Sequence, residues 1–389
     1  MNYDLLLPRR ILFGWGRRSE IGTWGATLGR RALLVTGSRT LAANGTIASL
    51  ADLLAGAGIE VASLAEVHRE PEVADVDSAV GRYQEIGPRT GDFVVAVGGG
   101  AALDLGKAVA ALATNRQSPT VKDYLEGVGR GLKIENAPLP VLAVPTTAGT
   151  GSEATRNAVI SSFDPPFKKS LRSDQMVPAV VLVDPELAVS APRTVTVWSG
   201  LDAITQLIES YLTRNARPVP QALCLEGLRE AIPALPRLIE SPDDRPAREA
   251  MAHAALLSGI ALANSGLGMA HGVAAALGVT CRVSHGLACA IMLPTAMRLN
   301  RRVRERETAT LGRLLTGREF RSDAEAAESA VEFMTDYCRK LGIPTRLRDV
   351  GVTKDQVEPL VLGSQGNSMN GNPRTIPECE LSETLEGLW

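Results

Sequence analysis

The chain has few histidines, and half of them lie in one stretch. Two of the four histidines, His271 and His285, fall between residues 262 and 300, and each is followed by glycine. A neutral imidazole binds a divalent metal, and histidines clustered with a carboxylate are the usual mark of a metal site. The pair is too far apart in sequence for one helical face, so the fold must bring them together. The alternative is two buried histidines at helix contacts, and only site geometry decides between these readings.

A carboxylate for such a site is available at Asp202. The segment SGLDAITQLIESYLT, residues 199–213, predicts a helix with Ser199 as its N-cap. Asp202 and Gln206 are spaced i, i+4 and therefore share one face of that helix. Asp202 could simply complement the helix dipole. Together with both histidines, however, it forms a set of two imidazoles and one carboxylate, which predicts a catalytic Zn²⁺ or Fe²⁺ site with positions open for substrate.

The first half of the chain contains a turn with the form of a phosphate-binding site. Residues 92–97, DFVVAV, predict a buried strand that runs into three glycines, and a predicted helix follows them. Glycines at a helix start let backbone N–H groups approach a phosphate, because no Cβ intervenes. Asp104 and Lys107 fall in the first turns of this helix. Asp104 could contact the ligand, or it could simply interact favourably with the positive end of the helix dipole. Lys107 is expected to be solvated.

A second turn, PTTAGTGSEAT at residues 145–155, follows the predicted strand 140–144. Small and hydroxyl-bearing residues at a strand end suggest the crevice where open α/β sheets bind ligands, although a polar turn could look similar. Further strands are predicted at 31–37, 59–64 and 179–183, and a helix is predicted at 46–57. These elements indicate an α/β N-terminal nucleotide-binding domain with a parallel sheet.

The second half predicts an all-helical C-terminal domain, because β-branched runs end at residues 194–197 and alanine and leucine dominate afterwards. Helices are expected at 199–213, 219–239, 246–263, 266–277, 285–299, 303–315, 322–341 and 354–362. A chain of 389 residues exceeds what one core usually holds. We therefore expect an α/β NAD(P)-binding domain at residues 1–186 and an all-helical metal and substrate domain at 187–389.

Composition argues against several classes of partner. The net charge of −2 gives no long-range attraction for nucleic acid or an anionic membrane. No window supplies the roughly 20 apolar residues of a membrane helix, and the N-terminal apolar run is too short for a signal peptide. The five cysteines are scattered and lack CxxC spacing, which favours thiols in a reducing cytosol over a disulfide framework. We expect a cytoplasmic protein that acts on a small molecule.

These motifs occur together, and in this order, in one known family. The chain resembles the iron-containing (group III) alcohol dehydrogenases, whose relatives include lactaldehyde reductase, glycerol dehydrogenase and maleylacetate reductase. The matching segments are GGGAALDLGKA (98–108), PTTAGTGSEAT (145–155), VDPEL (183–187), GLDAITQLIESY (200–211), GLGMAHG (266–272), HGLACAIMLP (285–294) and NPR (372–374). The resemblance implies a dehydroquinate synthase-like architecture, a homodimer, and a cofactor in the cleft between the domains.

The resemblance implies four metal ligands, at Asp202, Gln206, His271 and His285, of which Asp202, His271 and His285 are the implied catalytic residues. Gln206 stands where the family has histidine, and an amide oxygen is a weaker ligand than imidazole for a borderline metal. Relatives with three such ligands use zinc, so Fe²⁺ and Zn²⁺ both stay open. Ala275 also departs, since many members have a histidine there, near the nicotinamide.

The resemblance also locates the nicotinamide cofactor. Where many NAD-using relatives have an aspartate after the first strand, this chain has Gly37, followed by Ser38 and Arg39. Loss of the carboxylate removes repulsion against a 2′-phosphate, which a serine and an arginine can bind, so NADP is favoured over NAD. The implied cofactor-binding residues are Gly37, Ser38, Arg39, Gly98, Gly99, Gly100, Ala101, Asp104, Thr146, Thr147, Thr150, Ser152, Asn157 and Lys168.

The activity implied by the resemblance is NAD(P)-linked interconversion of a small alcohol and its aldehyde or ketone, with the metal as Lewis acid. Three alternatives stay open. A metal-independent reductase resembling maleylacetate reductase fits Gln206 and Ala275, a lyase resembling dehydroquinate synthase shares the fold, and a catalytically silent scaffold fits the departures from the family pattern. Arg374 of the NPR motif could meet an anionic substrate or hold its own loop.

Overall fold

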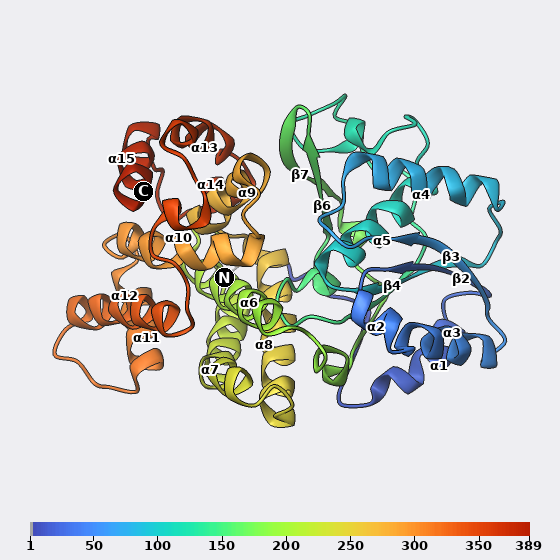
Figure 1. Ribbon diagram of the computed structural model, residues 1–389, viewed down its shortest axis with the longest axis horizontal. Helices are drawn as coiled ribbons and strands as arrows, with labels where there is room; N and C mark the ends of the chain where they lie inside the picture. Colours follow the sequence, from blue (N-terminus) through green and yellow to red (C-terminus); the bar gives the residue numbers. More distant parts are fainter. Residues whose placement is uncertain (1–2) are drawn as a thin grey trace. The chain divides into compact units, whose positions relative to one another are not determined.

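The structure is a computed structural model that describes residues 3–389 (Figure 1). The chain divides into an α/β unit, Leu6–Pro192, and a helical unit, Arg193–Trp389, which also includes residues 3–5. The predicted fold class is confirmed. The division falls at Pro192 rather than at residue 186, because Leu187 still packs in a core of the α/β unit.

A six-stranded parallel sheet organises the α/β unit, in the order β1-β8-β5-β4-β2-β3. The strands are β1 (Arg10–Phe13), β2 (Arg31–Thr36), β3 (Glu60–Glu66), β4 (Asp92–Gly98), β5 (Val141–Pro145) and β8 (Val180–Val183). Every residue of β4 and β5 is buried, which explains their continuous apolar sequences. Of these six strands, β1 was not predicted, and the other five agree with the sequence prediction to within two residues at each end.

Helices cover both faces of this sheet, as Figure 1 shows. Leu33 and Val94 point to one face and pack with α4 and α5, whereas Ala32 and Phe93 point to the other and pack with α1 and α3. The covering helices are α1 (Ile21–Gly25), α3 (Thr46–Gly56), α4 (Val73–Glu85) and α5 (Gly100–Leu112). Because successive side chains of a strand point to opposite faces of the sheet, each strand contributes residues to both hydrophobic cores.

The chain leaves β2 and β4 in opposite directions. From β2 it passes through α3 to β3, and from β4 it passes through α5, on the other face, to β5. The carboxyl ends of these neighbouring strands are thus the topological switch point, where open α/β sheets bind ligands. A hydrogen bond of 3.1 Å from Gly37 N–H to the Val97 carbonyl joins the two ends. Gly37 and the glycines after β4 consequently lie beside each other.

An antiparallel hairpin, β6 (Asn157–Phe163) and β7 (Pro166–Arg172), follows the second turn and was not predicted. Its sequence is only partly apolar because β7 is largely half-buried. The hairpin is tied to the segment before α4, where Ser161 N–H donates to the Pro71 carbonyl at 2.9 Å. It therefore brings β6 and β7 against residues that precede α4.

The helical unit consists of ten helices in residues 193–389. They are α6 (Arg193–Leu212), α7 (Pro218–Glu240), α8 (Arg245–Ser265), α9 (Met269–Cys281), α10 (His285–Asn300), α11 (Glu305–Thr316), α12 (Asp323–Lys340), α13 (Val357–Gly363), α14 (Asn367–Gly371) and α15 (Glu378–Leu388). The last two were not predicted. Among residues 3–389, no single helix is long and apolar enough to cross a membrane, and α8 with α9 pass that test only as a pair bent by 102°.

Helix α6 is the centre of this unit and contacts α7, α8 and α10. Residues 200–212 are all buried, so its surface is hydrophobic on every side apart from a few polar groups with partners. The predicted N-cap at Ser199 was wrong, because α6 begins at Arg193 and includes the β-branched run 194–197. Packing overrides the low helix propensity of that run.

Candidate metal centre and nucleotide-binding turns

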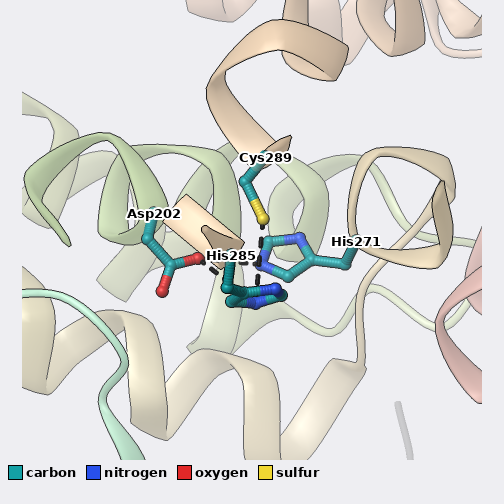
Figure 2. Close-up of side chains that lie close together, drawn as sticks. All are labelled: Asp202, His271, His285 and Cys289. Carbon is teal, nitrogen blue, oxygen red and sulfur yellow. Dashed lines mark hydrogen bonds and ion pairs between the residues drawn. The ribbon is translucent and has the colours of Figure 1, made fainter. Parts of the chain in front are cut away.

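Three helices bring three of the four predicted metal ligands together (Figure 2). Asp202 comes from the middle of α6, His271 from the first turn of α9, and His285 from the first residue of α10. Asp202 Oδ1 lies 3.2 Å from His271 Nε2 and 3.8 Å from His285 Nε2. Asp202 and His271 are buried, while 27% of the His285 side chain is exposed. A carboxylate and two imidazoles therefore converge on one point.

A fourth side chain, Cys289, belongs to this cluster and was not singled out from the sequence as a site residue. Its Sγ lies 3.8 Å from His285 Nε2, one turn earlier on α10. One donor atom each from Asp202, His271, His285 and Cys289 lies within 4.8 Å of the other three. The spacing of His285 and Cys289 at i, i+4 was the available signal, because it places both on one helical face.

Glycine after each histidine has a packing reason. A Cβ on Gly286 would lie 2.2 Å from the carbonyl oxygen of Trp198 in α6, so α10 can start against α6 only with glycine there. A Cβ on Gly272 would lie 3.2 Å from the carbonyl oxygen of Ser364. The Gly286 contact fixes the start of α10, and with it His285, close to Asp202.

Glu209 orients His271. One carboxylate oxygen of Glu209 accepts the Ala270 N–H at 2.7 Å, and the other lies 2.7 Å from His271 Nδ1. An Nδ1–H that donates to Glu209 leaves the Nε2 lone pair directed at Asp202 and His285, which is the tautomer a metal ligand needs. A Cβ on Gly268 would lie 2.8 Å from Glu209 Oε1, so glycine at this N-cap admits the carboxylate. Glu209 thus both caps the N-terminus of α9 and fixes the orientation of the His271 imidazole.

Protonation of the cluster reflects its crowding. Burial opposes ionisation of Asp202, but His285 and His271 hold the pKa of its carboxyl below the ordinary value. Burial lowers the pKa of His271, yet the neighbouring Cys289 sulfur and hydrogen bonds to Asp202 and Glu209 raise it well above the ordinary value. Burial raises the pKa of the Cys289 thiol to about 12. Protons take the place of a cation here, and a divalent metal would displace them, because it deprotonates the groups that bind it.

Gln206 is buried one turn after Asp202 on α6. Its Oε1 atom, the one with which an amide binds a metal, accepts a hydrogen bond from Ser258 Oγ at 2.7 Å. A carbonyl oxygen has a second lone pair. Coordination by Gln206 therefore stays a prediction.

The NPR motif holds the helices that carry the histidines. Asn372 is fully buried, accepts the Met269 N–H at the start of α9 at 3.2 Å, and exchanges hydrogen bonds with Asn300 at the end of α10. Arg374 donates to the Leu299 carbonyl at 3.2 Å and forms a bidentate pair with Glu380. Of the two roles considered for Arg374, the structure shows the one that holds its loop.

The predicted nucleotide-binding turns meet at the switch point of the α/β unit. The Gly98 carbonyl accepts the Thr146 N–H at 2.9 Å, so the turns after β4 and β5 lie side by side. A Cβ on Gly99 would lie 3.3 Å from Thr147, and one on Gly100 would lie 2.7 Å from Thr150. Ala101 follows in the first turn of α5. Residues without Cβ therefore line the start of α5, the arrangement that admits a phosphate to a helix N-terminus.

Asp104, Lys107 and Ser152 form a buried network beneath these turns. Asp104 accepts Ser152 Oγ–H at 2.5 Å and Val159 N–H at 3.0 Å. Lys107 donates to the Ser152 carbonyl and to Thr155 Oγ1, both at 2.8 Å, and also to the Asn157 carbonyl. The expectation of a solvated Lys107 was wrong, because only 1% of the residue is exposed. Burial lowers the pKa of this amine, while its pairing with Asp104 opposes that effect.

Asn157 and Lys168 lie on the β6–β7 hairpin. The buried Asn157 Oδ1 has no hydrogen-bond partner within residues 3–389, which fits an acceptor reserved for a ligand. Lys168 Nζ binds Glu70 at 2.6 Å, and Ser161 Oγ donates to the same carboxylate at 3.3 Å. Glu70 thus neutralises Lys168.

Gly37 packs tightly at the end of β2. A Cβ there would lie 2.8 Å from the Ala102 Cβ and 3.0 Å from the Val67 carbonyl oxygen. Packing alone thus requires glycine at this position. Ser38 caps α2 (Arg39–Ala43) by accepting the Leu41 N–H at 3.2 Å, and Arg39 is exposed.

Comparisons with known proteins cover both units. The family model for iron-containing alcohol dehydrogenases matches residues 8–185, and the model for the C-terminal part of that family matches residues 196–389. The NAD-dependent methanol dehydrogenase of Bacillus methanolicus is 29% identical, over 98% of this chain and 99% of its own. Lactaldehyde reductase of Escherichia coli (strain K12) is 32% identical, over 96% and 97%. A crystal structure of a 1,3-propanediol oxidoreductase superposes with a TM-score of 0.92 at 31% identity, over 100% of both chains. The resemblance inferred from the motifs is confirmed.

Proposed function

Because the chain belongs to the iron-containing alcohol dehydrogenase family, we propose that it is a metal-dependent, NAD(P)-linked oxidoreductase that interconverts a small alcohol and its aldehyde or ketone. The observation that carries this proposal is the convergence of Asp202, His271 and His285 from three helices. Two imidazoles and a carboxylate are a donor set that fits Zn²⁺ or Fe²⁺.

The side chains of the centre would divide the work as follows. Asp202, His271 and His285 hold the metal, and Glu209 keeps His271 in the tautomer that exposes Nε2. When bound, the metal supplies Lewis acidity to the substrate oxygen, and the nicotinamide exchanges the hydride. Because His285 is partly exposed, it is the member of the set that substrate can approach.

The α/β unit would hold the cofactor at the switch point. Backbone N–H groups at Gly98–Ala101 bind the pyrophosphate, and the turn at Thr146–Ser152 borders it. Asn157 Oδ1 offers an acceptor to the cofactor. Asp104 acts indirectly, because both its oxygens are bound within the unit. The fit is thus good for a dinucleotide.

We propose that NADP is preferred over NAD, since no acidic side chain occurs at residues 37–40 and Ser38 and Arg39 can meet a 2′-phosphate. Replacing Gly37 is a poor test, because any side chain there collides with Val67 and Ala102. Ser38→Asp is better, since aspartate also caps helices and α2 would survive. The variant should lose affinity for NADPH and keep its affinity for NADH. Tighter NADH than NADPH binding in the unchanged protein contradicts the proposal.

The activity is tested by anaerobic purification, metal analysis and an aldehyde and ketone panel with NADH and NADPH. We expect one Fe²⁺ or Zn²⁺ per chain and cofactor oxidation with at least one small carbonyl compound. Full activity in protein stripped of metal would instead indicate a metal-independent reductase. Sedimentation in the same buffer tests the homodimer that we propose for the assembled enzyme.

A further inference from the structure

We propose that Cys289 is a metal ligand, so that the centre is an Asp, His, His, Cys set whose thiolate takes the place of the histidine missing at Gln206. This rests on the proposed metal-dependent function and adds a ligand to it. Cys289 lies within the matching segment HGLACAIMLP, but it is not one of the four ligand positions that the family resemblance implies.

The position of the sulfur carries the inference. Cys289 is fully buried, yet its Sγ is directed into the same small space as Asp202 Oδ1 and both histidine Nε2 atoms (Figure 2). In a tetrahedral Zn²⁺ site with bonds of about 2.0–2.3 Å, neighbouring donor atoms lie roughly 3.3–3.6 Å apart. Three of the six separations among these atoms, 3.2, 3.8 and 3.8 Å, are already close to those values, and all six lie within 4.8 Å.

The helices leave the sulfur little choice of direction. Cys289 lies one turn after His285, on the same face of α10, and α10 contacts both α6 and α9. Gly286 permits this close approach, because a Cβ would collide with Trp198. Any metal held by Asp202, His271 and His285 thus lies next to a thiol. Binding replaces the S–H bond with a sulfur–metal bond and releases one proton to solvent.

A thiolate changes which metal the centre prefers. Thiolate is a soft ligand that favours Zn²⁺, whereas oxygen and imidazole sets accept iron readily. Gln206 is a poor substitute for the family's histidine, since an amide oxygen is a weaker ligand than imidazole and Ser258 already occupies one of its lone pairs. With Cys289 as fourth ligand, the site stays strong without a donor from position 206, and the substrate oxygen would enter as a fifth ligand. We therefore infer a zinc centre within a family described by iron.

Cobalt provides the decisive test, because a thiolate bound to Co²⁺ gives a near-ultraviolet charge-transfer band that oxygen and nitrogen ligands do not. The full-length protein is stripped of metal and titrated with Co²⁺ without oxygen. We expect the band in the unchanged protein at one Co²⁺ per chain and in Cys338→Ala, which removes a buried thiol of α12 outside the cluster. Cys289→Ala and the more conservative Cys289→Ser should lose it.

Two further measurements complete the test. Zinc should leave Cys289→Ala for a chelator faster than it leaves the unchanged protein, by more than the roughly 10–100-fold typical of losing an outer hydrogen-bond partner of a ligand. In competition, Cys289→Ser should shift the bound zinc-to-iron ratio towards iron. Cobalt bound without the band, or a band that survives in Cys289→Ser, overturns the ligand role and leaves the proposed function intact. Failure of the unchanged protein to bind any metal overturns both.

Discussion

Both units bury ionisable side chains, but they arrange them in opposite ways. In the α/β unit, Asp92 is enclosed by proton donors, with Arg31 at 2.7 and 2.8 Å and Tyr83 O–H at 3.0 Å. In the helical unit, Asp202 is surrounded by two imidazoles and a thiol, all of which can present a lone pair to the same point. The first arrangement is complete without a ligand. The second one is complete only when protons or a cation occupy its centre.

The difference separates a structural ion pair from a binding site more reliably than burial does. Lys107 is as deeply buried as Asp202, and it would look functional from burial alone. Its partners, however, are a carboxylate, a hydroxyl and two carbonyls, so its charge is satisfied where it lies. A buried carboxylate therefore indicates a binding site when the side chains around it, like the carboxylate itself, can bind a cation.

Breaking the closed pair should have the largest effect on stability. Asp92→Asn leaves Arg31 buried without its counter-charge, which costs about 3–5 kcal/mol. Denaturant unfolding measures the loss, and addition of a metal or chelator should not change it. Asp174→Asn is the control, because Asp174 pairs with Arg156 at the surface and is 68% exposed, so its effect should stay within about 1 kcal/mol.

The same pair predicts a pH dependence. Arg31, Tyr83 and the Arg89 N–H overcome the effect of burial and lower the pKa of Asp92. The stabilisation is therefore fully present above the unfolded-state pKa of about 3.9 and is lost as pH falls through the lower folded-state value. The stability gap between the unchanged protein and Asp92→Asn should narrow below about pH 4. A gap that widens on acidification contradicts the assignment.

Removing the metal should affect only the open arrangement. At a free metal concentration of 100 times Kd, binding stabilises the native state by about 2.7 kcal/mol. Chelation should therefore accelerate amide hydrogen exchange in α6, α9 and α10, with little change in β2 and β4. Equal acceleration in both units would show that the metal is not confined to the helical cluster.

Glu209→Gln should weaken the open arrangement without removing a ligand. The amide can still meet one backbone N–H, but it no longer favours the Nδ1–H tautomer of His271, so metal affinity should fall roughly 10–100-fold. Competition with a chelator measures the change. Glu226→Gln is the control, since Glu226 pairs with Arg229 on the surface of α7. An unchanged affinity in Glu209→Gln means that His271 is held by the helix alone.

Gln206→His should have the smallest effect. If the new imidazole reaches the centre, metal loss to a chelator slows modestly, by about tenfold or less, and activity stays equal or falls because the open position is contested. The substitution also removes one of the two hydrogen-bond partners of Ser258, which offsets part of the gain. Faster metal loss than in the unchanged protein shows that position 206 does not face the centre.

Buried strands with continuous apolar runs could be predicted from the sequence, and β2, β4 and β5 were found almost to the residue. The β6–β7 hairpin could not, because half-buried strands mix polar and apolar residues irregularly and pairing decides their structure. The start of α6 was placed six residues late, since the run 194–197 favours a strand locally and becomes helical only through packing.

The site was predicted as a set of residue types, and its geometry was not. Asp202, His271 and His285 stand in a recognisable order, but their meeting depends on glycines that let helices touch. Cys289 was read as an ordinary buried thiol, because a cysteine without a CxxC partner carries no local signal. Glu209 was missed for a similar reason, since its carboxylate acts on a residue 62 positions away in sequence.

Unequal exposure within the cluster has a kinetic consequence. Asp202, His271 and Cys289 are enclosed, and Glu209 fixes His271 before any ion arrives, so most of the coordination shell is preorganised. Of these four side chains, His285 is the one that is substantially exposed, so it borders the route by which an ion would enter or leave. We therefore expect the exchange rate of the ion to depend on the mobility of the His285 side chain as well as on the strength of the metal–ligand bonds.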